Sequence, residues 1–322
     1  MKAVIHHKYG SPGELQLATI EKPVPKDNEV LVRIVSTTVT AGDCELRAMK
    51  IAFPLNIPMR FFVNRKFPNG KILGQEMAGV IEDLGDGVTQ FKRGQRIFGA
   101  TLFRFGCYAE YICLPDSHPL LGIPEGLSFE ETATIPTGGL NALHFLNKAR
   151  VKKGDNLLIN GAGGSIGTYC IQLAKQRGAH ITAVDSEEKF GLLRELGAHK
   201  VIDYQKGDFW QSAAQYDAII DIVGTAKLKG LRVVQKKGRY VMGNPRLGLV
   251  FAATWRNLLG GKKIAFKPAD YEKKDMQHLL NLMVGGEIKA AIDKRLPLEE
   301  IKKAHEYVES GKKLGNLIIN IN

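Results

Sequence analysis

One stretch of the sequence decides the fold: Leu157-Leu-Ile-Asn-Gly161-Ala-Gly163-Gly164-Ser165-Ile-Gly167. Its apolar start is typical of a buried strand, and residues 165–177 have the period of an amphipathic helix. Gly161 permits a tight turn between the two. A glycine-rich turn that joins a strand to a helix is the context in which dinucleotides are bound. We therefore predict a dinucleotide-binding turn, and the alternative is a strand–helix turn without a ligand.

The remaining glycines of this stretch have separate physical roles. Gly163 and Gly164 let the backbone approach a diphosphate, and Gly167 lets the helix pack closely on the strand. The first backbone N–H groups of a helix have no partner within it, and the helix dipole favours anions there. We expect Ser165 and Ile166 to contact the phosphates for this reason.

From about residue 127 onward, strand patterns alternate with helix patterns. The predicted strands after the turn are 180–184, 200–203, 218–222 and 239–242, and the further predicted helices are 132–149 and 187–196. Alternation of this kind builds strand–helix–strand units around a parallel sheet. The sequence therefore predicts an α/β protein with a doubly wound parallel sheet.

Residues 1–126 show a different sequence pattern, in which short runs of β-branched residues are separated by Gly and Pro. Val30–Val35 alternates at period 2, as a half-buried strand does. Segment 49–71 has no sustained period, and we expect it to wall a pocket or to cover the surface. We predict a compact, mostly β domain here. The tail has two helical patterns and one strand pattern that resemble neither block, at 274–285, 298–310 and 317–321.

Composition bounds the class of protein. The chain has 322 residues, 44% of them hydrophobic and 24% charged, as in ordinary globular proteins. No apolar run approaches the length of a membrane span, and we expect no membrane partner. The first residues lack the pattern of a secretory signal, and four scattered cysteines do not form a disulfide framework. We therefore expect a cytoplasmic protein.

The net charge of +12 favours anionic partners or simply a solvated surface. Lys227–Arg232 and Lys236–Arg239 form a local concentration of basic residues. No basic run is interleaved with aromatic residues, as binding of single-stranded nucleic acid would require. A nucleic-acid partner is therefore not expected.

Asp185 ends the second predicted strand, 24 positions after Gly161. An acidic residue at about this place accepts hydrogen bonds from the adenosine ribose. The alternative is that Asp185 caps the helix predicted at 187–196. The two roles are compatible.

Several motifs together resemble the medium-chain dehydrogenase/reductase superfamily. They are Gly74-Gln-Glu-Met-Ala-Gly79, Gly106-Cys-Tyr-Ala-Glu-Tyr111, the turn at 161–167, Tyr216-Asp-Ala-Ile-Ile-Asp-Ile-Val-Gly224 and Gly315-Asn-Leu-Ile-Ile319. Glycines 161, 164 and 167 resemble its zinc-independent quinone-oxidoreductase branch. The resemblance implies a GroES-like, mostly β catalytic domain from residues 1–126 and 270–322. It implies a Rossmann nucleotide-binding domain from residues 127–269.

The zinc alcohol dehydrogenases of this superfamily carry zinc ligands at three positions. Those positions are occupied here by Thr40, by Gln75 and by the Pro136–Thr137 region. Zinc prefers thiolate, imidazole or carboxylate ligands, and none of these residues supplies one. Only Cys107 and Cys113 lie where the superfamily's structural zinc lobe has four cysteines. We expect no zinc.

Without a Lewis acid, the expected acceptor is an activated π-system, a quinone or an α,β-unsaturated carbonyl, reduced by NAD(P)H. The alternatives are a zinc-free alcohol dehydrogenase, an enoyl-thioester reductase, or a nucleotide-binding protein with an RNA-binding or structural role. The resemblance also implies a homodimer, in which a strand at Gly261–Lys267 pairs with its copy.

The resemblance implies the catalytic candidates. Thr40 stands where the family has Asn, and Asn141 stands where it has a Thr beside the nicotinamide. Asp43 and Arg47 match a family stretch beside the pocket, and their alternative role is a structural ion pair. The proton donor stays open among Thr40, Asn141 and water. The segments expected along the nicotinamide ribose contain Val223, Gly224, Gly243 and Asn244.

The choice between NADPH and NADH rests on the end of the second strand. Asp185, followed by Ser186, favours NADH because a carboxylate repels a 2′-phosphate. Lys189 and Tyr204 match positions that bind the 2′-phosphate in NADPH-dependent quinone reductases. We favour NADPH on the strength of this resemblance.

Overall fold

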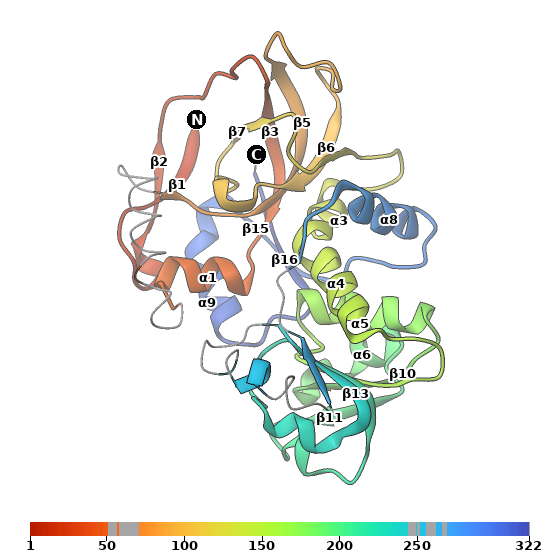
Figure 1. Ribbon diagram of the computed structural model, residues 1–322. Coiled ribbons are helices and arrows are strands. Elements are labelled where there is room, and N and C mark those ends of the chain that lie inside the picture. The colour runs from red at the N-terminus through yellow and green to blue at the C-terminus, as the bar shows by residue number, and fades with distance from the viewer. Residues whose placement is uncertain are drawn as a thin grey trace. The chain divides into compact units, whose positions relative to one another are not determined.

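The computed structural model describes residues 1–50, 57, 71–243, 249, 252–255, 262–265 and 269–321. These form two compact units (Figure 1). The first comprises Met1–Thr137, Tyr271–Val284 and Ala290–Asn322, and the second comprises Gly138–Asp270 and Gly285–Lys289. Segment 51–70, apart from residue 57, and Asn244 lie outside the described residues, as do the ends of the predicted dimer strand.

The first unit is built from two sheets. Strands β2 (Leu15–Thr19), β1 (Lys2–His6) and β4 (Lys71–Ile72) form the smaller, antiparallel sheet. The larger sheet has the order β15 (Ile292–Pro297), β16 (Asn316–Asn320), β3 (Glu29–Thr38), β5 (Glu76–Leu84), β6 (Arg96–Ala100) and β8 (Leu120–Gly122), and β7 (Tyr111–Pro115) also pairs with β3. Its helices are α1 (Ala41–Ala48), α3 (Phe129–Ala133), α8 (Lys273–Val284) and α9 (Ile301–Glu309). Short 3-10 turns lie at Pro12–Glu14, Leu102–Arg104 and Leu298–Glu300.

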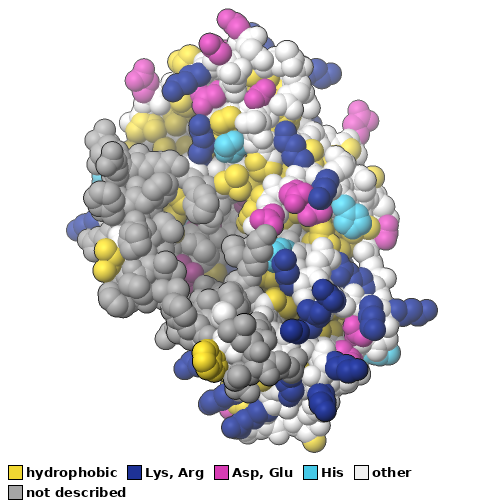
Figure 2. Space-filling view, viewed as in Figure 1, with side chains coloured by type: hydrophobic (Ala, Val, Ile, Leu, Met, Phe, Trp, Pro, Cys, Tyr) yellow, Lys and Arg dark blue, Asp and Glu magenta, His cyan; other side chains and the backbone are white. Residues whose placement is uncertain are grey.

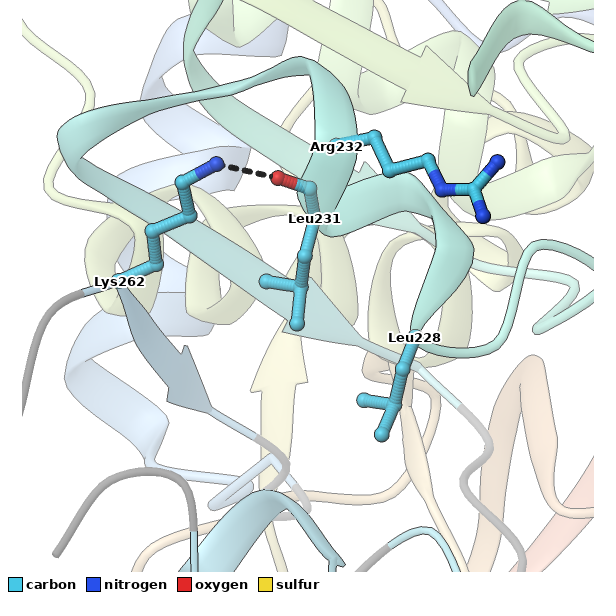
Figure 3. Close-up of a pocket in the computed structure, with 4 residues that line it drawn as sticks. All are labelled: Leu228, Leu231, Arg232 and Lys262. Atoms are coloured by element: carbon cyan, nitrogen blue, oxygen red, sulfur yellow. Dashed lines mark hydrogen bonds between the residues drawn. The ribbon is translucent and has the colours of Figure 1, made fainter. Parts of the chain in front are cut away.

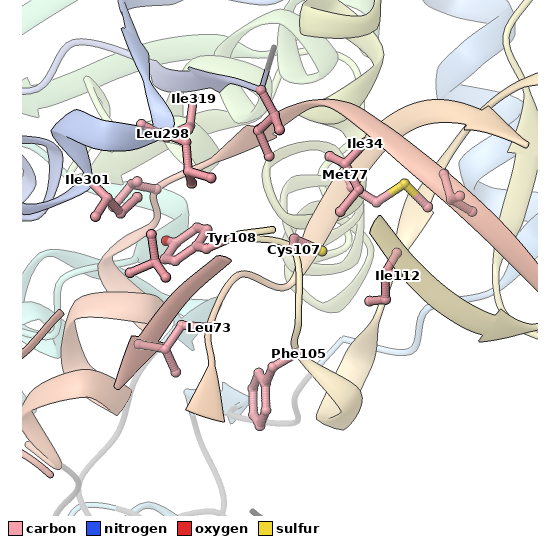
Figure 4. Close-up of a cluster of buried hydrophobic side chains, with 14 of the residues drawn as sticks. Ile34, Leu73, Met77, Phe105, Cys107, Tyr108, Ile112, Leu298, Ile301 and Ile319 are labelled. Atoms are coloured by element: carbon pink, nitrogen blue, oxygen red, sulfur yellow. The ribbon is translucent and has the colours of Figure 1, made fainter. Parts of the chain in front are cut away.

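The core of this unit joins distant parts of the chain. Ile34, Met77 and Ile319, from β3, β5 and β16, are buried in one cluster with Tyr108 and Ile301 (Figure 4). The C-terminal tail therefore belongs to the mostly β unit, as the fold expected from the resemblance requires. Strand β15 was not predicted because its sequence, Ile-Asp-Lys-Arg-Leu-Pro, is largely polar.

The strand expected at Val30–Val35 is present within β3. Val30, Val32 and Ile34 are buried, Arg33 is exposed and Val35 is partly exposed, so the alternation of period 2 holds except at Leu31, which is also buried. Strand β3 lies inside the sheet, with β5 on one edge and β7 and β16 on the other, and α3 packs against it.

The second unit is a six-stranded parallel sheet, which confirms the predicted fold class. The order is β11 (Lys200–Asp203), β10 (His180–Asp185), β9 (Asn156–Asn160), β12 (Tyr216–Asp221), β13 (Val234–Met242) and β14 (Lys263–Ala265). In chain order this is 3-2-1-4-5-6, the doubly wound dinucleotide-binding arrangement. Its helices are α4 (Leu140–Ala149), α5 (Ser165–Gln176) and α6 (Phe190–Leu196), with 3-10 turns at Glu187–Lys189, Phe209–Gln211 and Lys229–Val233.

The helix predicted at 132–149 is interrupted. Helix α3 ends at Ala133, a π-helical turn occupies Ile135–Gly139, and α4 begins at Leu140. Pro136 has no N–H for a helical hydrogen bond, and two glycines follow it. The boundary between the two units falls in this turn, after Thr137. In the described part of the chain, no helix has the length and apolar character to cross a bilayer.

Candidate functional site

The glycine turn lies at the carboxyl end of β9, beside the point where the strand order reverses. Gly161 has φ +83°, and a Cβ there would lie 2.9 Å from Val223 Cγ1. Gly164 is the N-cap of α5, and a Cβ there would meet only the Gly161 oxygen, at 3.7 Å. The turn therefore leaves open space in front of the first N–H groups of α5, those of Ser165 and Ile166 included. Ligands of such sheets bind at this kind of position.

Two glycines of the turn are needed for packing. A Cβ at Gly167 would lie 2.4 Å from the Ala162 oxygen, so that only glycine fits between helix and turn. A Cβ at Gly163 would lie 2.5 Å from Lys189 Cδ. The Gly163 N–H donates to Asp185 Oδ2 at 2.7 Å. Gly163 therefore makes room for the end of β10, a role that the sequence did not reveal.

Asp185 is buried and surrounded by donors. Its Oδ1 accepts from the Ser186 N–H at 2.9 Å and lies 3.0 Å from Lys189 Nζ. The Asp185 and Lys189 side chains are each only 8% exposed. Asp185 is not a helix cap, because Ser186 occupies that position and makes no side-chain cap bond. Tyr204 lies beside the pair with its side chain largely exposed, and its N–H donates to the Asp185 carbonyl oxygen.

A second buried carboxylate fixes the turn after β12. Asp221 Oδ1 accepts from Asn160 Nδ2 and from the Gly224 N–H, both at 2.8 Å. Asp221 Oδ2 accepts from the Tyr240 hydroxyl at 2.6 Å. The Gly243 N–H donates to the Asp221 carbonyl oxygen. This network holds the ends of β9, β12 and β13 together and thereby positions Val223. Asn160, Asp221 and Tyr240 were missed from sequence, although Asn160 directly precedes the glycine turn.

Two catalytic candidates of the first unit lie at the start of α1. Thr40 and Asp43 form a capping box: the Asp43 N–H donates to Thr40 Oγ1 at 3.2 Å, and the Thr40 N–H donates to Asp43 Oδ2 at 2.9 Å. The Thr40 hydroxyl also donates to Asp43 Oδ2, at 2.6 Å. Gln75 Nε2 donates to Asp43 Oδ1 at 3.3 Å. Burial raises the pKa of Asp43, and these hydrogen bonds oppose the rise in part.

The proposed structural ion pair between Asp43 and Arg47 is not formed. Arg47 is buried, and its Nη2 lies 2.6 Å from Glu309 Oε1 on α9. Asp43 is held by Thr40 and Gln75 instead. The two residues lie on one helix, but the packing of α1 against α9 gives Arg47 a different partner.

Glu76 is a buried carboxyl group that the sequence did not single out. It accepts hydrogen bonds from the Thr38 hydroxyl and, at 2.6 Å, from the Thr137 N–H. Burial raises its pKa to about 7. Glu76 thus joins β3 and β5 to the π-helical turn at the unit boundary. Glu76 lies in the Gly74–Gly79 motif, but that motif was interpreted only through the resemblance and the zinc-ligand position at Gln75.

The residues at the superfamily's zinc-ligand positions do not fit a zinc ion. The Thr40 hydroxyl and the Gln75 amide both donate to Asp43, and Thr137 offers its N–H to Glu76. Across the described ranges, no group of three His, Cys, Asp or Glu side chains is placed to hold a metal. The third catalytic candidate, Asn141, lies in the first turn of α4 and is partly exposed.

Comparison with known proteins gives two family matches. The alcohol dehydrogenase GroES-like domain matches residues 26–139, and a zinc-binding dehydrogenase domain matches residues 196–319. Together they cover most of the chain. The second match lies outside the three zinc-ligand positions described above, so it supplies no ligand there.

Individual relatives agree with these matches. Human quinone oxidoreductase is 28% identical over 332 residues, which are 97% of this chain and 94% of the relative. The 2-methylene-furan-3-one reductase of Solanum lycopersicum is 28% identical over 99% of this chain and 79% of its own length. The crystallised quinone oxidoreductase of Coxiella burnetii has a TM-score of 0.89 at 28% identity and covers 100% of this chain and 99% of that one.

Proposed function

Because the chain belongs to the medium-chain dehydrogenase/reductase superfamily of oxidoreductases, we propose that it reduces quinones or α,β-unsaturated carbonyls with NAD(P)H. The observation that carries the proposal is the glycine turn with its open space, at the switch point of a 3-2-1-4-5-6 sheet. Relatives named for a quinone and for an enone support the acceptor class. The second unit then holds the cofactor, and the first contributes to the chemistry.

The residues of the second unit fit a dinucleotide. Gly161 and Gly164 give the diphosphate access to the backbone, and Ser165 and Ile166 offer it N–H groups. When bound, the reduced nicotinamide supplies the hydride. The segments that contain Val223, Gly224, Gly243 and Asn244 run along its ribose, and the Asp221 network keeps the first of these in place.

We favour NADPH over NADH because Asp185 is neutralised from within the protein. A free carboxylate would repel a 2′-phosphate, but the Lys189 ammonium lies 3.0 Å from it. The backbone N–H groups of Ser186 and Gly163 also donate hydrogen bonds to the Asp185 carboxylate. Its repulsion of a 2′-phosphate, which would favour NADH, is therefore reduced. The exposed Tyr204 ring adds a surface for the adenosine.

Hydride addition to an enone leaves an oxygen that needs a proton. We assign this proton to the Thr40 hydroxyl. The Thr40 alkoxide would then take a proton from the carboxylic acid form of Asp43, whose Oδ2 lies 2.6 Å from Thr40 Oγ1, and the resulting carboxylate would accept the hydrogen bond described above. The raised pKa of Asp43 suits a carboxyl group that has to hold a proton. Asn141 is assigned to the nicotinamide side of the site. No metal takes part in this chemistry.

The first test is turnover. Purified protein should oxidise NADPH in the presence of a simple quinone or enone, and incubation with a zinc chelator should leave the rate unchanged. Gly164→Val places a side chain in the open space of the turn, so the KM for NADPH should rise at least tenfold. Gly191→Ala is the matched control, because a Cβ there meets nothing within 4 Å. No oxidation of either cofactor across a broad panel of acceptors would refute the proposal.

The preference for NADPH has its own test. Lys189→Ala leaves Asp185 without its counter-charge, so the KM for NADPH should rise about tenfold while the KM for NADH changes little. Lys289→Ala removes an exposed lysine that pairs with Glu195 and should change neither constant. Equal losses with both cofactors would show that Lys189 only supports the fold.

The proposal also covers the oligomeric state of the protein and its location in the cell. Within the described residues, β14 is the edge strand of the parallel sheet and has β13 on one side only. Pairing of this edge with its copy would give a homodimer, and light scattering that finds a stable monomer would refute it. All four cysteines are free thiols. This favours a reducing compartment, and we place the protein in the cytoplasm.

A further inference from the structure

One part of the chain carries nearly all of its excess positive charge. Residues 222–269 contain eleven Lys and Arg and no Asp or Glu, whereas the net charge of the whole chain is +12. The structure describes eight of these eleven: Lys227, Lys229, Arg232, Lys236, Lys237, Arg239, Lys262 and Lys263. In the space-filling view, Lys and Arg side chains gather on the part of the face that Figure 1 labels β11 and β13 (Figure 2).

Most of these residues lie around one edge of the parallel sheet, which we call the amino edge, whereas the Lys227 N–H donates to the Gly224 carbonyl oxygen in the turn after the carboxyl end of β12. Arg239 and Lys263 are partners in register near the starts of the parallel pairing of β13 and β14. Lys262 Nζ donates to the Leu231 carbonyl oxygen at 2.5 Å, which ties the start of β14 to the 3-10 turn before β13. The glycine turn follows the carboxyl end of β9. The amino edge is therefore opposite the cofactor site, and its charge does not bind the cofactor.

The basic edge extends beyond these two strands. Arg150 ends α4, and Lys152 and Lys153 precede β9 on exposed backbone. Partial burial and the charge of Arg150 both lower the pKa of Arg239. Like charges collected in this way repel one another.

Among the residues that the structure describes, no carboxylate forms an ion pair with the cations of the amino edge, although Lys206 and Lys289 of the same unit pair with Glu187 and Glu195. Six of the eight are exposed. Cations at this edge outnumber its carboxylates, which include Asp155 and Asp217, and such an excess produces a field that attracts a polyanion.

A cavity of about 310 Å³ opens in this edge and is lined by Leu228, Leu231, Arg232 and Lys262. Figure 3 shows the two leucine side chains pointing to the same side, Arg232 extending away from them, and Lys262 reaching toward the Leu231 carbonyl oxygen. An apolar surface between two cations fits a ligand that is both apolar and anionic. Trp210 lies nearby, with Lys229 Nζ 5.6 Å from the centre of its ring.

We propose that the amino edge docks on the surface of an anionic lipid bilayer, with acyl chain or glycerol groups against Leu228 and Leu231 and lipid phosphates on the surrounding lysines and arginines. This contact is peripheral and needs no spanning segment, so it revises the expectation of no membrane partner that rested on the absence of such a segment. A nucleic acid fits less well, because it would leave the two leucines of the cavity unused. The inference does not depend on the proposed reaction.

The test is co-sedimentation with vesicles of phosphatidylcholine alone and of phosphatidylcholine mixed with phosphatidylserine. The protein should bind only the mixed vesicles, and added salt should release it. The double variant Arg232→Glu with Lys236→Glu should bind at least tenfold more weakly. The control Lys289→Glu with Lys303→Glu makes the same change in net charge at exposed lysines away from this edge and should bind like the wild type.

Both double variants should unfold at the same urea concentration as the wild type, which shows that they are folded whether or not the proposed reaction holds. Leu228→Ser should weaken vesicle binding without changing its salt dependence, because it alters the cavity and no charge. Equal weakening in the edge and control variants would overturn the proposal, because net charge alone would then explain binding. Tighter binding to RNA than to mixed vesicles at equal phosphate concentration would also overturn it and would identify a nucleic-acid surface.

Discussion

Two buried carboxyl groups, Asp221 in the second unit and Glu76 in the first, are held in different ways. Asp221 receives the amide of Asn160, the N–H of Gly224 and the hydroxyl of Tyr240. Glu76 receives hydrogen bonds from Thr38 and the Thr137 N–H, and its pKa rises to about 7. The first arrangement fixes backbone geometry, and the second keeps a group that exchanges protons near neutral pH. The buried carboxylate of the second unit therefore holds backbone segments in place, whereas that of the first unit can exchange a proton.

The largest effect is expected for Asp221→Ala. It removes the acceptor of three hydrogen bonds, two of them buried, so the free energy of unfolding should fall by about 3 kcal/mol. Urea unfolding measures the loss. A loss below about 1 kcal/mol would mean that water replaces the carboxylate and that the network is not rigid.

Glu76→Gln should instead change how stability depends on pH. The folded pKa of Glu76 lies above its ordinary value of 4.5, so the folded state binds the proton more tightly. Its contribution to stability is therefore complete below pH 4.5 and is lost as the pH rises to about 7. The loss is about 3 kcal/mol. The variant should lack this part of the pH dependence, as urea unfolding at pH 5 and pH 8 would show. Equal slopes in both proteins would contradict the assignment.

Two helix capping boxes, one in a buried and one in an exposed setting, provide a second comparison with smaller expected effects on stability. Thr40 with Asp43 and Ser128 with Glu131 have the same hydrogen bonds, but the first box is buried and the second is exposed. Thr40→Ala and Ser128→Ala should each cost about 1 kcal/mol of stability. Only Thr40→Ala should lower kcat, and kcat measured for both variants tests the proton assignment. An unchanged kcat in Thr40→Ala would exclude the Thr40 hydroxyl as the donor.

The smallest effect is expected at Asp217, on the same strand as Asp221. Its single hydrogen bond accepts the Asn156 N–H at the exposed start of β9. Asp217→Ala should cost less than about 1 kcal/mol in the same unfolding assay. A loss of unfolding free energy similar to that of Asp221→Ala would show that the carboxylates at the two ends of β12 contribute equally to stability.

The sequence predicted the second unit well because its signals are local. Strand and helix periods and the turn at residues 161–167 each occupy a short window, and the parallel sheet follows from their alternation. The first unit was harder. Strand β15 has a polar sequence, and β3 pairs with β16, which is far away in the chain.

The candidate site shows the same limit. The sequence identified Asp185 and Lys189 separately, but their ion pair depends on how Gly163 lets the chain approach, which only the structure shows. Arg47 was matched with Asp43 on its own helix, yet its partner comes from α9. Contacts between residues that are distant in sequence leave no periodic signal.

The pairing of β16 with β3 has a consequence for biosynthesis. Residues 138–270, nearly all of the second unit, leave the ribosome as one continuous segment and can begin to fold at once. The edge of β3 at Ser36–Thr38 can pair with β16 only after residues Ile318–Asn320 have been synthesised. During this interval the nascent chain exposes an unpaired strand edge, at which another chain could pair.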